Sequence, residues 1–291
     1  FAEVKKSRAS IVFHLAAQPL VRHSYTYPKE TFDTNFTGSL NILEAVRKLT
    51  NIKTTIIITT DKVYDNSKNR IFKETDKLGG LDPYSASKVC VEFLFSSYVK
   101  SFFKNNKKQM LATVRAGNVI GGGDYSEDRL IPDIYKSLKN SKNINLRNPL
   151  SIRPWQHVLE PLSGYLALAS ELHSSSKHNG AAFNFGPPAT QNHSVEELVE
   201  EIKINLVGKD WLDKSEGNKM PPEAGLLKLC CDKALHELSW QATLNFKETV
   251  KWTADWYRTY YESSSQDARD LTMSQISQYM QLATERKTSK L

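Results

Sequence analysis

Long apolar segments and low-complexity tracts are both missing from this chain of 291 residues. No apolar run approaches the ~20 residues that a membrane-spanning helix needs. The hydrophobic fraction of 40% and the charged fraction of 24% are typical of a folded chain and not of a disordered one. We therefore expect a globular protein with no membrane partner, long enough for one large domain or two smaller ones.

Cysteine is scarce. Cys90, Cys230 and Cys231 form no CxxC pair and have no zinc-type spacing. This pattern excludes a disulfide framework, and we predict no structural metal. A reducing cytoplasm fits the pattern, and residues 1–18 lack the charged start, apolar middle and cleavage site of a signal peptide.

Clustered charge is also missing, although the formal net charge is +7. The basic residues are scattered along the chain. The densest group, KNNKK at 104–108, lies in a polar stretch typical of a solvated loop. No nucleic-acid recognition motif accompanies it, so we expect no nucleic acid as a partner. The milder inference from the charge is a preference for an anionic ligand.

Strand and helix patterns alternate in the first part of the chain. The runs SIVFHLAA at 10–17 and TTIIITT at 54–60 predict strands, and apolar residues at helical spacing predict a helix over 30–49 between them. A second helix is predicted over 83–103, and a third strand over 110–121 that runs into a glycine-rich turn. This alternation indicates an α/β fold with a parallel sheet covered by helices.

The alternation loosens beyond residue 121. Apolar spacing there predicts helices over 129–140, 157–172 and 194–206, and a strand over 181–186. Ser194 and Glu197 form a capping-box pattern at the start of the last of these helices. The final amphipathic helix is rich in aromatic residues, which we interpret as packing and not as a cofactor site.

Reactive side chains directly follow the second predicted strand. In parallel sheets, ligands bind beyond the carboxyl ends of the strands. Thr60, Asp61 and Lys62 would project into that crevice, whereas in a core they would be costly. We therefore predict a site at this end of the sheet.

Tyr84 and Lys88, in the sequence DPYSASK, are four residues apart at the start of the helix predicted over 83–103. Asp82 suits the N-cap and Pro83 suits the first turn. Residues at this spacing share a helix face, and an ammonium one turn away favours the phenolate form of Tyr84. Taken alone, the spacing equally fits a surface tyrosine beside a solvated lysine. With Thr60 at the end of the preceding strand, it indicates a site for proton abstraction and hydride transfer.

These motifs together resemble the extended short-chain dehydrogenase/reductase family. The matching features are HLAA at 14–17, Asn35 in DTNFTGSLNILEA, the strand-end Thr60, and Tyr84 with Lys88. The resemblance covers nearly the whole chain.

The resemblance implies a Rossmann sheet that binds NAD. Ala16, Ala17 and Asn35 would lie near the cofactor, and Tyr84 and Lys88 at its nicotinamide end. Residues 1–185 would form a partial dinucleotide-binding Rossmann domain, and residues 186–291 a smaller α/β C-terminal substrate lobe. Residues 119–150 would contribute to that lobe.

Asp61 and Lys62 resemble, within this family, the 4,6-dehydratases that act on nucleotide sugars. Those enzymes carry an acid pair at a position where the epimerases usually carry small residues. Asp61 matches the general acid that protonates the departing C6 hydroxyl. Lys62 replaces the usual glutamate that removes the C5 proton, so it either takes that proton or only orients Asp61 or the sugar. The segments LGGLDPYSASK, VRAGNVIGGGD, DRLIPD and IRPWQHVLEPLSGY resemble the branch that dehydrates CDP-glucose.

The resemblance also implies where the substrate diphosphate binds. Asn118 and Arg153 match phosphate-holding positions, and the planar fork of arginine suits paired phosphate oxygens. Arg129 is a further candidate, although it equally fits a solvated arginine at a helix start. We interpret His157 as structural in preference to a nucleotide ligand. The family further implies a homodimer built on the helices predicted over 30–49 and 83–103.

A glycine-rich turn before the first predicted strand is missing as well. Rossmann domains use such a turn and the following helix N-terminus to bind the pyrophosphate. IGGGD at 120–124 follows the predicted catalytic helix and cannot replace it. We therefore expect the chain to lack the first strands of its sheet and, as it stands, to hold dinucleotide poorly. Another nucleotide-sugar dehydratase or epimerase, or an inactive relic, remain as alternatives.

Overall fold

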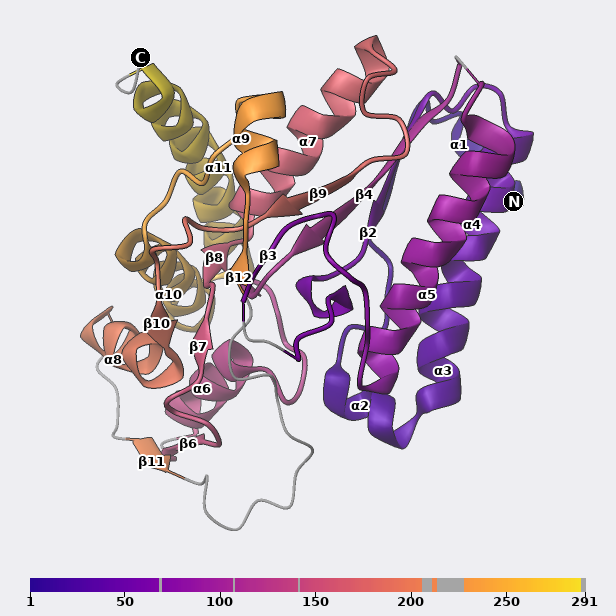
Figure 1. Ribbon diagram of the computed structural model, residues 1–291. Helices are drawn as coiled ribbons and strands as arrows, with labels where there is room; N and C mark the ends of the chain where they lie inside the picture. The colour runs from indigo at the N-terminus through magenta and orange to yellow at the C-terminus, as the bar shows by residue number, and fades with distance from the viewer. Residues whose placement is uncertain (68–69, 107, 141, 206–210, 214–227, 289–291) are drawn as a thin grey trace. The chain divides into compact units, whose positions relative to one another are not determined.

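A computed structural model describes residues 1–288 except 68–69, 107, 141, 206–210 and 214–227 (Figure 1). The chain divides into two compact units. The first comprises Phe1–Gly117, Leu162–Phe185 and Lys228–Trp240, and the second Asn118–Pro161, Gly186–Leu227 and Gln241–Leu291. Among the residues described, no helix combines the length and apolar character needed to cross a membrane.

A parallel sheet of order β1-β2-β4-β9 forms the centre of the first unit. Its strands are β1 (Ile11–His14), β2 (Thr54–Ile58), β4 (Met110–Ala116) and β9 (Ala182–Phe185). Each neighbouring pair is parallel, with His14 opposite Ile57 and Ile57 opposite Thr113. The predicted α/β fold with a parallel sheet is confirmed, because each strand returns to the sheet through a helical crossover.

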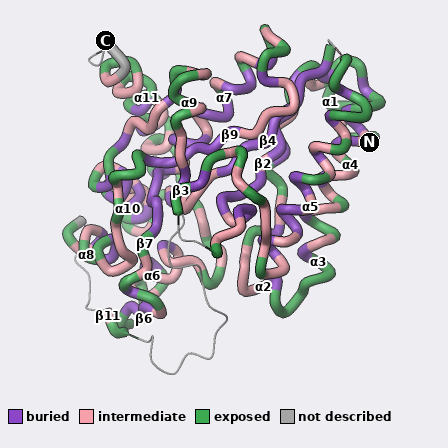
Figure 2. Tube along the Cα trace, in the orientation of Figure 1, coloured by how far each residue is buried: buried purple, intermediate pink, exposed green. Residues whose placement is uncertain are grey.

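Helices α4 (Gly38–Lys48) and α5 (Pro83–Tyr98) run side by side along this sheet (Figure 1). Leu43 of α4, Val91 of α5 and Ile57 of β2 are fully buried in one apolar cluster between helices and sheet. Figure 2 shows the buried stretches along β2 and β4. The predicted helices are present but interrupted. The first comprises α3 (Pro28–Phe32), the π-helix η1 (Asp33–Thr37) and α4, and the second continues from α5 into the π-helix η3 (Val99–Phe103).

Shorter elements complete the first unit: α1 (Ala2–Ser7), α2 (Val21–Thr26), the 3₁₀ helix η2 (Asp61–Val63), β3 (Ile71–Phe72), most of α7 (Leu159–Ser174), β12 (Lys228–Leu229) and α9 (Asp232–Leu238). Lys228–Trp240, which the sequence placed in the substrate lobe, belongs here because β12 pairs with β3 and Asn184 donates to the Cys230 carbonyl. Helix α7 lies so close to β9 that a Cβ at Gly164 would be 2.3 Å from the Phe185 ring.

The second unit is built from helices and two- or three-residue strands: β5 (Val119–Ile120), α6 (Leu130–Lys139), β6 (Ile144–Leu146), β7 (Ile152–Arg153), β8 (Gln156–His157), β10 (His193–Ser194), α8 (Val195–Asn205), β11 (Trp211–Asp213), α10 (Phe246–Glu262) and α11 (Ser265–Thr288). The capping box is confirmed, since Ser194 and Glu197 exchange side chain to backbone hydrogen bonds. The aromatic residues of α10 do pack: Tyr257 is fully buried and stacks on Tyr135 at 4.2 Å between ring centroids.

Candidate active site

The start of α5 is held by two polar contacts. Asp82 caps the helix by accepting from the Ser85 amide at 2.9 Å, and Pro83 occupies the first turn, as the sequence predicts. Ser24 of α2 is completely buried and its hydroxyl accepts from the Tyr84 amide at 3.1 Å. The backbone of Tyr84 is therefore fixed from both sides, and its side chain is only 7% exposed.

Lys88 links α5 to the end of β2. Its ammonium donates to the Ile58 carbonyl at 3.1 Å, and the residue is 4% exposed. Burial lowers the pKa of Lys88 to about 8, while nearby Glu92 acts in the opposite direction. The cation thus lies at the carboxyl end of a central strand, where the sequence predicts a site.

The turn after β2 carries the other three predicted residues. Thr60 caps η2, where its hydroxyl accepts from the Lys62 amide at 3.3 Å and donates to Asp61 Oδ1 at 3.1 Å. Asp61 is 2% exposed and Lys62 is partly exposed. Helix η2 packs against α5. Thr60, Asp61 and Lys62 therefore share one end of the sheet with the helix that carries Tyr84, although their roles remain predictions.

Asn35 connects the loop after β1 to α5. It lies in the π-helix η1 and is 1% exposed. Its side chain accepts from the Gln18 amide at 2.8 Å and donates to the Gln18 carbonyl at 3.1 Å and the Ser87 hydroxyl at 2.9 Å. Ala16 and Ala17, in the same loop, are exposed and partly exposed. The alanines are thus accessible, whereas Asn35 holds the loop in place.

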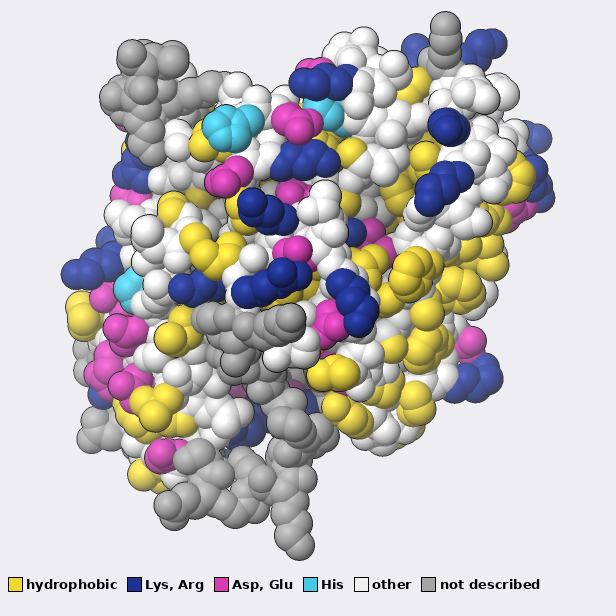
Figure 3. All heavy atoms as spheres, viewed as in Figure 1, with side chains coloured by type: hydrophobic (Ala, Val, Ile, Leu, Met, Phe, Trp, Pro, Cys, Tyr) yellow, Lys and Arg dark blue, Asp and Glu magenta, His cyan; other side chains and the backbone are white. Residues whose placement is uncertain are grey.

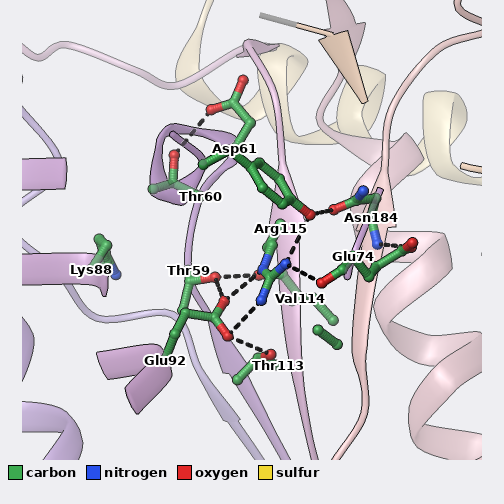
Figure 4. Close-up of polar contacts among 12 residues, drawn as sticks. Thr59, Thr60, Asp61, Glu74, Lys88, Glu92, Thr113, Val114, Arg115 and Asn184 are labelled. Atoms are coloured by element: carbon green, nitrogen blue, oxygen red, sulfur yellow. Dashed lines mark hydrogen bonds and ion pairs between the residues drawn. The ribbon is translucent and has the colours of Figure 1, made fainter. Parts of the chain in front are cut away.

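A buried polar network that the sequence did not reveal lies next to the turn (Figure 4). Arg115 of β4 forms a two-pronged ion pair with Glu92 of α5, at 2.8 and 2.9 Å. Glu92 also accepts from the hydroxyls of Thr59, at 2.6 Å, and Thr113, at 3.1 Å. Arg115 in turn donates to the Tyr64 hydroxyl at 2.8 Å. Glu92 follows Lys88 by four residues, and that helical spacing is the signal that could have found it.

The predicted diphosphate residues all lie in the second unit. Arg153 is buried in β7 and donates to the Ile152 carbonyl, and Asn118 accepts from the Gln156 amide through its backbone. Arg129 precedes α6 and pairs with Asp124 at 3.4 Å, about a third of its side chain being exposed. The assignment of these residues to phosphate binding stays a prediction.

His157 is structural in its surroundings. It is 2% exposed, and its ring meets Trp252 edge-on at 5.8 Å between centroids. Burial lowers the pKa of His157 to about 4, so the ring is neutral at ordinary pH.

Comparison with known proteins identifies the family of the chain. A family model described as GDP-mannose 4,6 dehydratase matches residues 2–253. The chain belongs to this family. Among similar proteins, a CDP-glucose 4,6-dehydratase from Salmonella typhimurium is 43% identical, over 97% of this chain and 79% of its own. A human dTDP-D-glucose 4,6-dehydratase is 24% identical, over 88% of this chain and 71% of its own.

Solved structures agree with the family fold. A dTDP-glucose 4,6-dehydratase from Bacillus anthracis, in complex with NAD, has a TM-score of 0.73 and 23% identity, over 91% of this chain and 78% of its own. A UDP-glucuronic acid 4-epimerase from Bacillus cereus has a TM-score of 0.77 and 19% identity, over 89% of this chain and 78% of its own. At these identities the likeness establishes the fold.

Proposed function

We propose that this chain dehydrates CDP-glucose to CDP-4-keto-6-deoxyglucose with NAD as a recycled cofactor. The observation that carries the proposal is the turn with Asp61 and Lys62, which ends β2 beside the helix that carries Tyr84 and Lys88. The 43% identity to a CDP-glucose 4,6-dehydratase supports the same substrate.

The residues at this end of the sheet fit the nicotinamide half of a dinucleotide. Ala16 and Ala17 are small and accessible, which suits close approach of a flat ligand. The Lys88 ammonium has three donors and directs one to the Ile58 carbonyl, which leaves donors suited to ribose hydroxyls. When bound, NAD⁺ supplies the acceptor for the C4 hydride and the means of returning that hydride to C6.

Tyr84 would act first. As a phenolate stabilised by the Lys88 ammonium, it takes the proton of the C4 hydroxyl while the C4 hydride leaves, which gives a 4-keto sugar. Thr60 would orient the same hydroxyl. The ketone makes the C5 proton acidic, so the next step can take place at the neighbouring carbons.

Elimination would use Lys62 and Asp61. Lys62 would accept the C5 proton, and Asp61 would protonate the C6 hydroxyl, which leaves as water. Asp61 is 2% exposed and accepts a hydrogen bond from the Thr60 hydroxyl, so its carboxyl group is held in place at the end of β2. Lys62 would return its proton to C5, and the bound cofactor would supply the hydride for C6. Transfer of one proton from Tyr84 to Asp61 restores the starting states.

Arg153, Arg129 and Asn118 are our candidates for the substrate diphosphate. The net charge of +7 favours an anionic ligand, and arginine can bond phosphate oxygens in pairs. We expect Arg153→Met to raise the KM for the nucleotide sugar with a smaller effect on kcat. An unchanged KM would remove Arg153 from the assignment.

Product analysis tests the proposal. The protein is mixed with NAD⁺ and, separately, with CDP-, dTDP-, UDP- and GDP-linked glucose, and products are identified by mass spectrometry and NMR. We expect loss of water from CDP-glucose alone and no product from the Tyr84→Phe control. A 4-epimer would indicate an epimerase, and dehydration of another sugar would refute the CDP assignment. Absence of product while NAD⁺ is bound would refute the dehydratase assignment, and failure to bind NAD⁺ would favour a relic.

We also propose a homodimer that forms through α5. Phe93 and Phe102 are 62% and 49% exposed on α5 and η3, and Figure 3 shows hydrophobic side chains gathered over α5 and α2. An exposed apolar surface of this kind is typical of a protein interface. Phe93→Glu should convert dimers to monomers in light scattering, whereas the exposed Leu166→Glu, on α7, should not.

A cytoplasmic location completes the proposal. Cys90, Cys230 and Cys231 form no disulfide, which is the usual state of cysteines in a reducing compartment. Fractionation of cells that express the tagged protein tests this assignment.

A further inference from the structure

The buried ion pair between Glu92 and Arg115 has no part in the chemistry proposed above. Both residues are almost fully buried, at 5% and 4% exposed. Such a pair adds little net stability, because the cost of removing two charges from water offsets their attraction. A buried pair that also joins several elements can instead fix the arrangement of those elements.

The pair holds both ends of the turn that carries Asp61. At the near end, the Thr59 hydroxyl donates to Glu92 Oε1 at 2.6 Å (Figure 4). At the far end, the Tyr64 hydroxyl accepts from Arg115 Nη1 at 2.8 Å and donates to Asn184 Oδ1 at 2.7 Å. Thr59 and Tyr64 directly bracket residues 60–63. We call Thr59, Tyr64, Glu92 and Arg115 the turn clamp.

The turn clamp is anchored on the helix that carries the proposed base. Tyr84, Lys88 and Glu92 follow one another at intervals of four residues along α5 and therefore lie on the same side of the helix. The helix start is fixed independently of the turn clamp, through Asp82 and Ser24. Tyr84 thus keeps its place without the clamp, whereas Thr60 and Asp61 are positioned through the turn. Because Thr60 only orients the hydroxyl that Tyr84 deprotonates, loosening the turn should affect oxidation less than elimination.

We propose that Glu92 and Arg115 are positioning residues that fix the Asp61–Lys62 turn against α5, and that elimination depends on them more than C4 oxidation does. This inference rests on the proposed function. Proton donation requires the acid within hydrogen-bond reach of the leaving oxygen. A displacement of about 1 Å at a reacting group can cost roughly 100-fold in rate.

Two substitutions loosen the turn without touching Asp61 or Tyr84. Thr59→Val removes the link to Glu92, and Tyr64→Phe removes the link to Arg115 while both keep the side-chain shape. Tyr98→Phe is the matched control, because it also removes a hydroxyl from α5. That hydroxyl donates to Glu44 at 2.9 Å, away from the turn.

Single-turnover reactions with CDP-glucose separate the two steps. We expect both clamp variants to slow elimination by at least about tenfold and cofactor reduction by less than about threefold, so that reduced cofactor and a 4-ketoglucose nucleotide accumulate. The Tyr98→Phe control should match the wild type in both steps. Equal slowing of both steps, or no slowing, would overturn the proposal.

Hydrogen exchange of the peptide over residues 59–64 tests the turn clamp without any reaction. The Val63 and Tyr64 amides bond the Thr60 and Asp61 carbonyls within this turn. Exchange should be faster in both clamp variants, with unchanged exchange in α5, and should match the wild type in Tyr98→Phe. If the wild type converts no sugar, the proposed function fails, and unchanged exchange in the variants separately refutes the turn clamp.

Discussion

Replacement of Glu92 by glutamine should cause a large loss of stability. The carboxylate accepts four hydrogen bonds, two from the Arg115 guanidinium and one each from Thr59 and Thr113. Glutamine keeps the shape but removes the charge, so that Arg115 becomes an unpaired buried cation. Removing one partner of a buried ion pair costs about 3–5 kcal/mol.

Urea denaturation followed by circular dichroism measures this loss, and the melting temperature should fall by on the order of 10 °C. Glu44→Gln is the control, because Glu44 forms a two-pronged pair with Arg47 on the exposed side of α4, where removing the charge should change the midpoint little. A loss below about 1 kcal/mol for Glu92→Gln would refute the reasoning, since it would mean that water reaches Arg115.

The double variant Glu92→Leu with Arg115→Met separates stability from positioning. Replacing a buried pair by apolar residues of similar volume is often neutral or stabilising, so the double variant should recover most of the loss. It should nevertheless remain slow in elimination. A double variant as unstable as the single one would show that the ion pair is needed for stability itself.

Four further outcomes are expected. Tyr84→Phe should reduce formation of reduced cofactor by about 10²–10⁴-fold in stopped-flow absorbance, and an unchanged rate would exclude Tyr84 as the base. Asp61→Asn should slow water loss by a similar factor, with reduced cofactor accumulating; turnover at the original rate would contradict its role. The pKa of Lys88 is about 8 in the folded protein and 10.5 ordinarily, so the unfolded chain binds more protons between these pH values. The free energy of unfolding of the wild type should therefore rise by about 3 kcal/mol as the pH increases across that window, whereas that of Lys88→Met should not. Because the pKa of His157 is about 4 and not 6.5, stability should fall by about 3 kcal/mol as the pH drops across that window, and urea midpoints of His157→Phe should lack this loss.

The sheet, the main helices and the strand-end turn were predictable because their signals are local. The β-branched run before Thr59 fixes β2, and Asp82 with Pro83 marks the start of α5. The π-helix η1 around Asn35 left no such signal, because the spacing of apolar residues changes little when one residue is inserted into a helix. The two-residue strand β12 is likewise too short to show an alternation of apolar and polar residues. Its place in the first unit was therefore not predicted.

The network around Glu92 could not be derived from the sequence because its partners come from distant segments. Thr59, Arg115 and Asn184 meet only when β2, β4 and β9 align in the sheet. Two signals were present: Glu92 follows Lys88 at helical spacing, and Arg115 is a single charge in an otherwise uncharged strand, where a buried charge requires an opposite partner. The sequence did not show which acid that partner is.

The residues that hold the turn are separate from Asp61 and Lys62, which lie inside it. Thr59 and Tyr64 hold the two ends of the turn, whereas the start of α5 is held separately by Asp82 and Ser24. Under the proposed function, exchange of Asp61 and Lys62 for other pairs would therefore change the fate of the 4-keto sugar, whereas Tyr84 and Thr60 would still form it. One scaffold could in this way acquire new reactions by altering two neighbouring codons, with no rebuilding of the sheet or of the helix beside it.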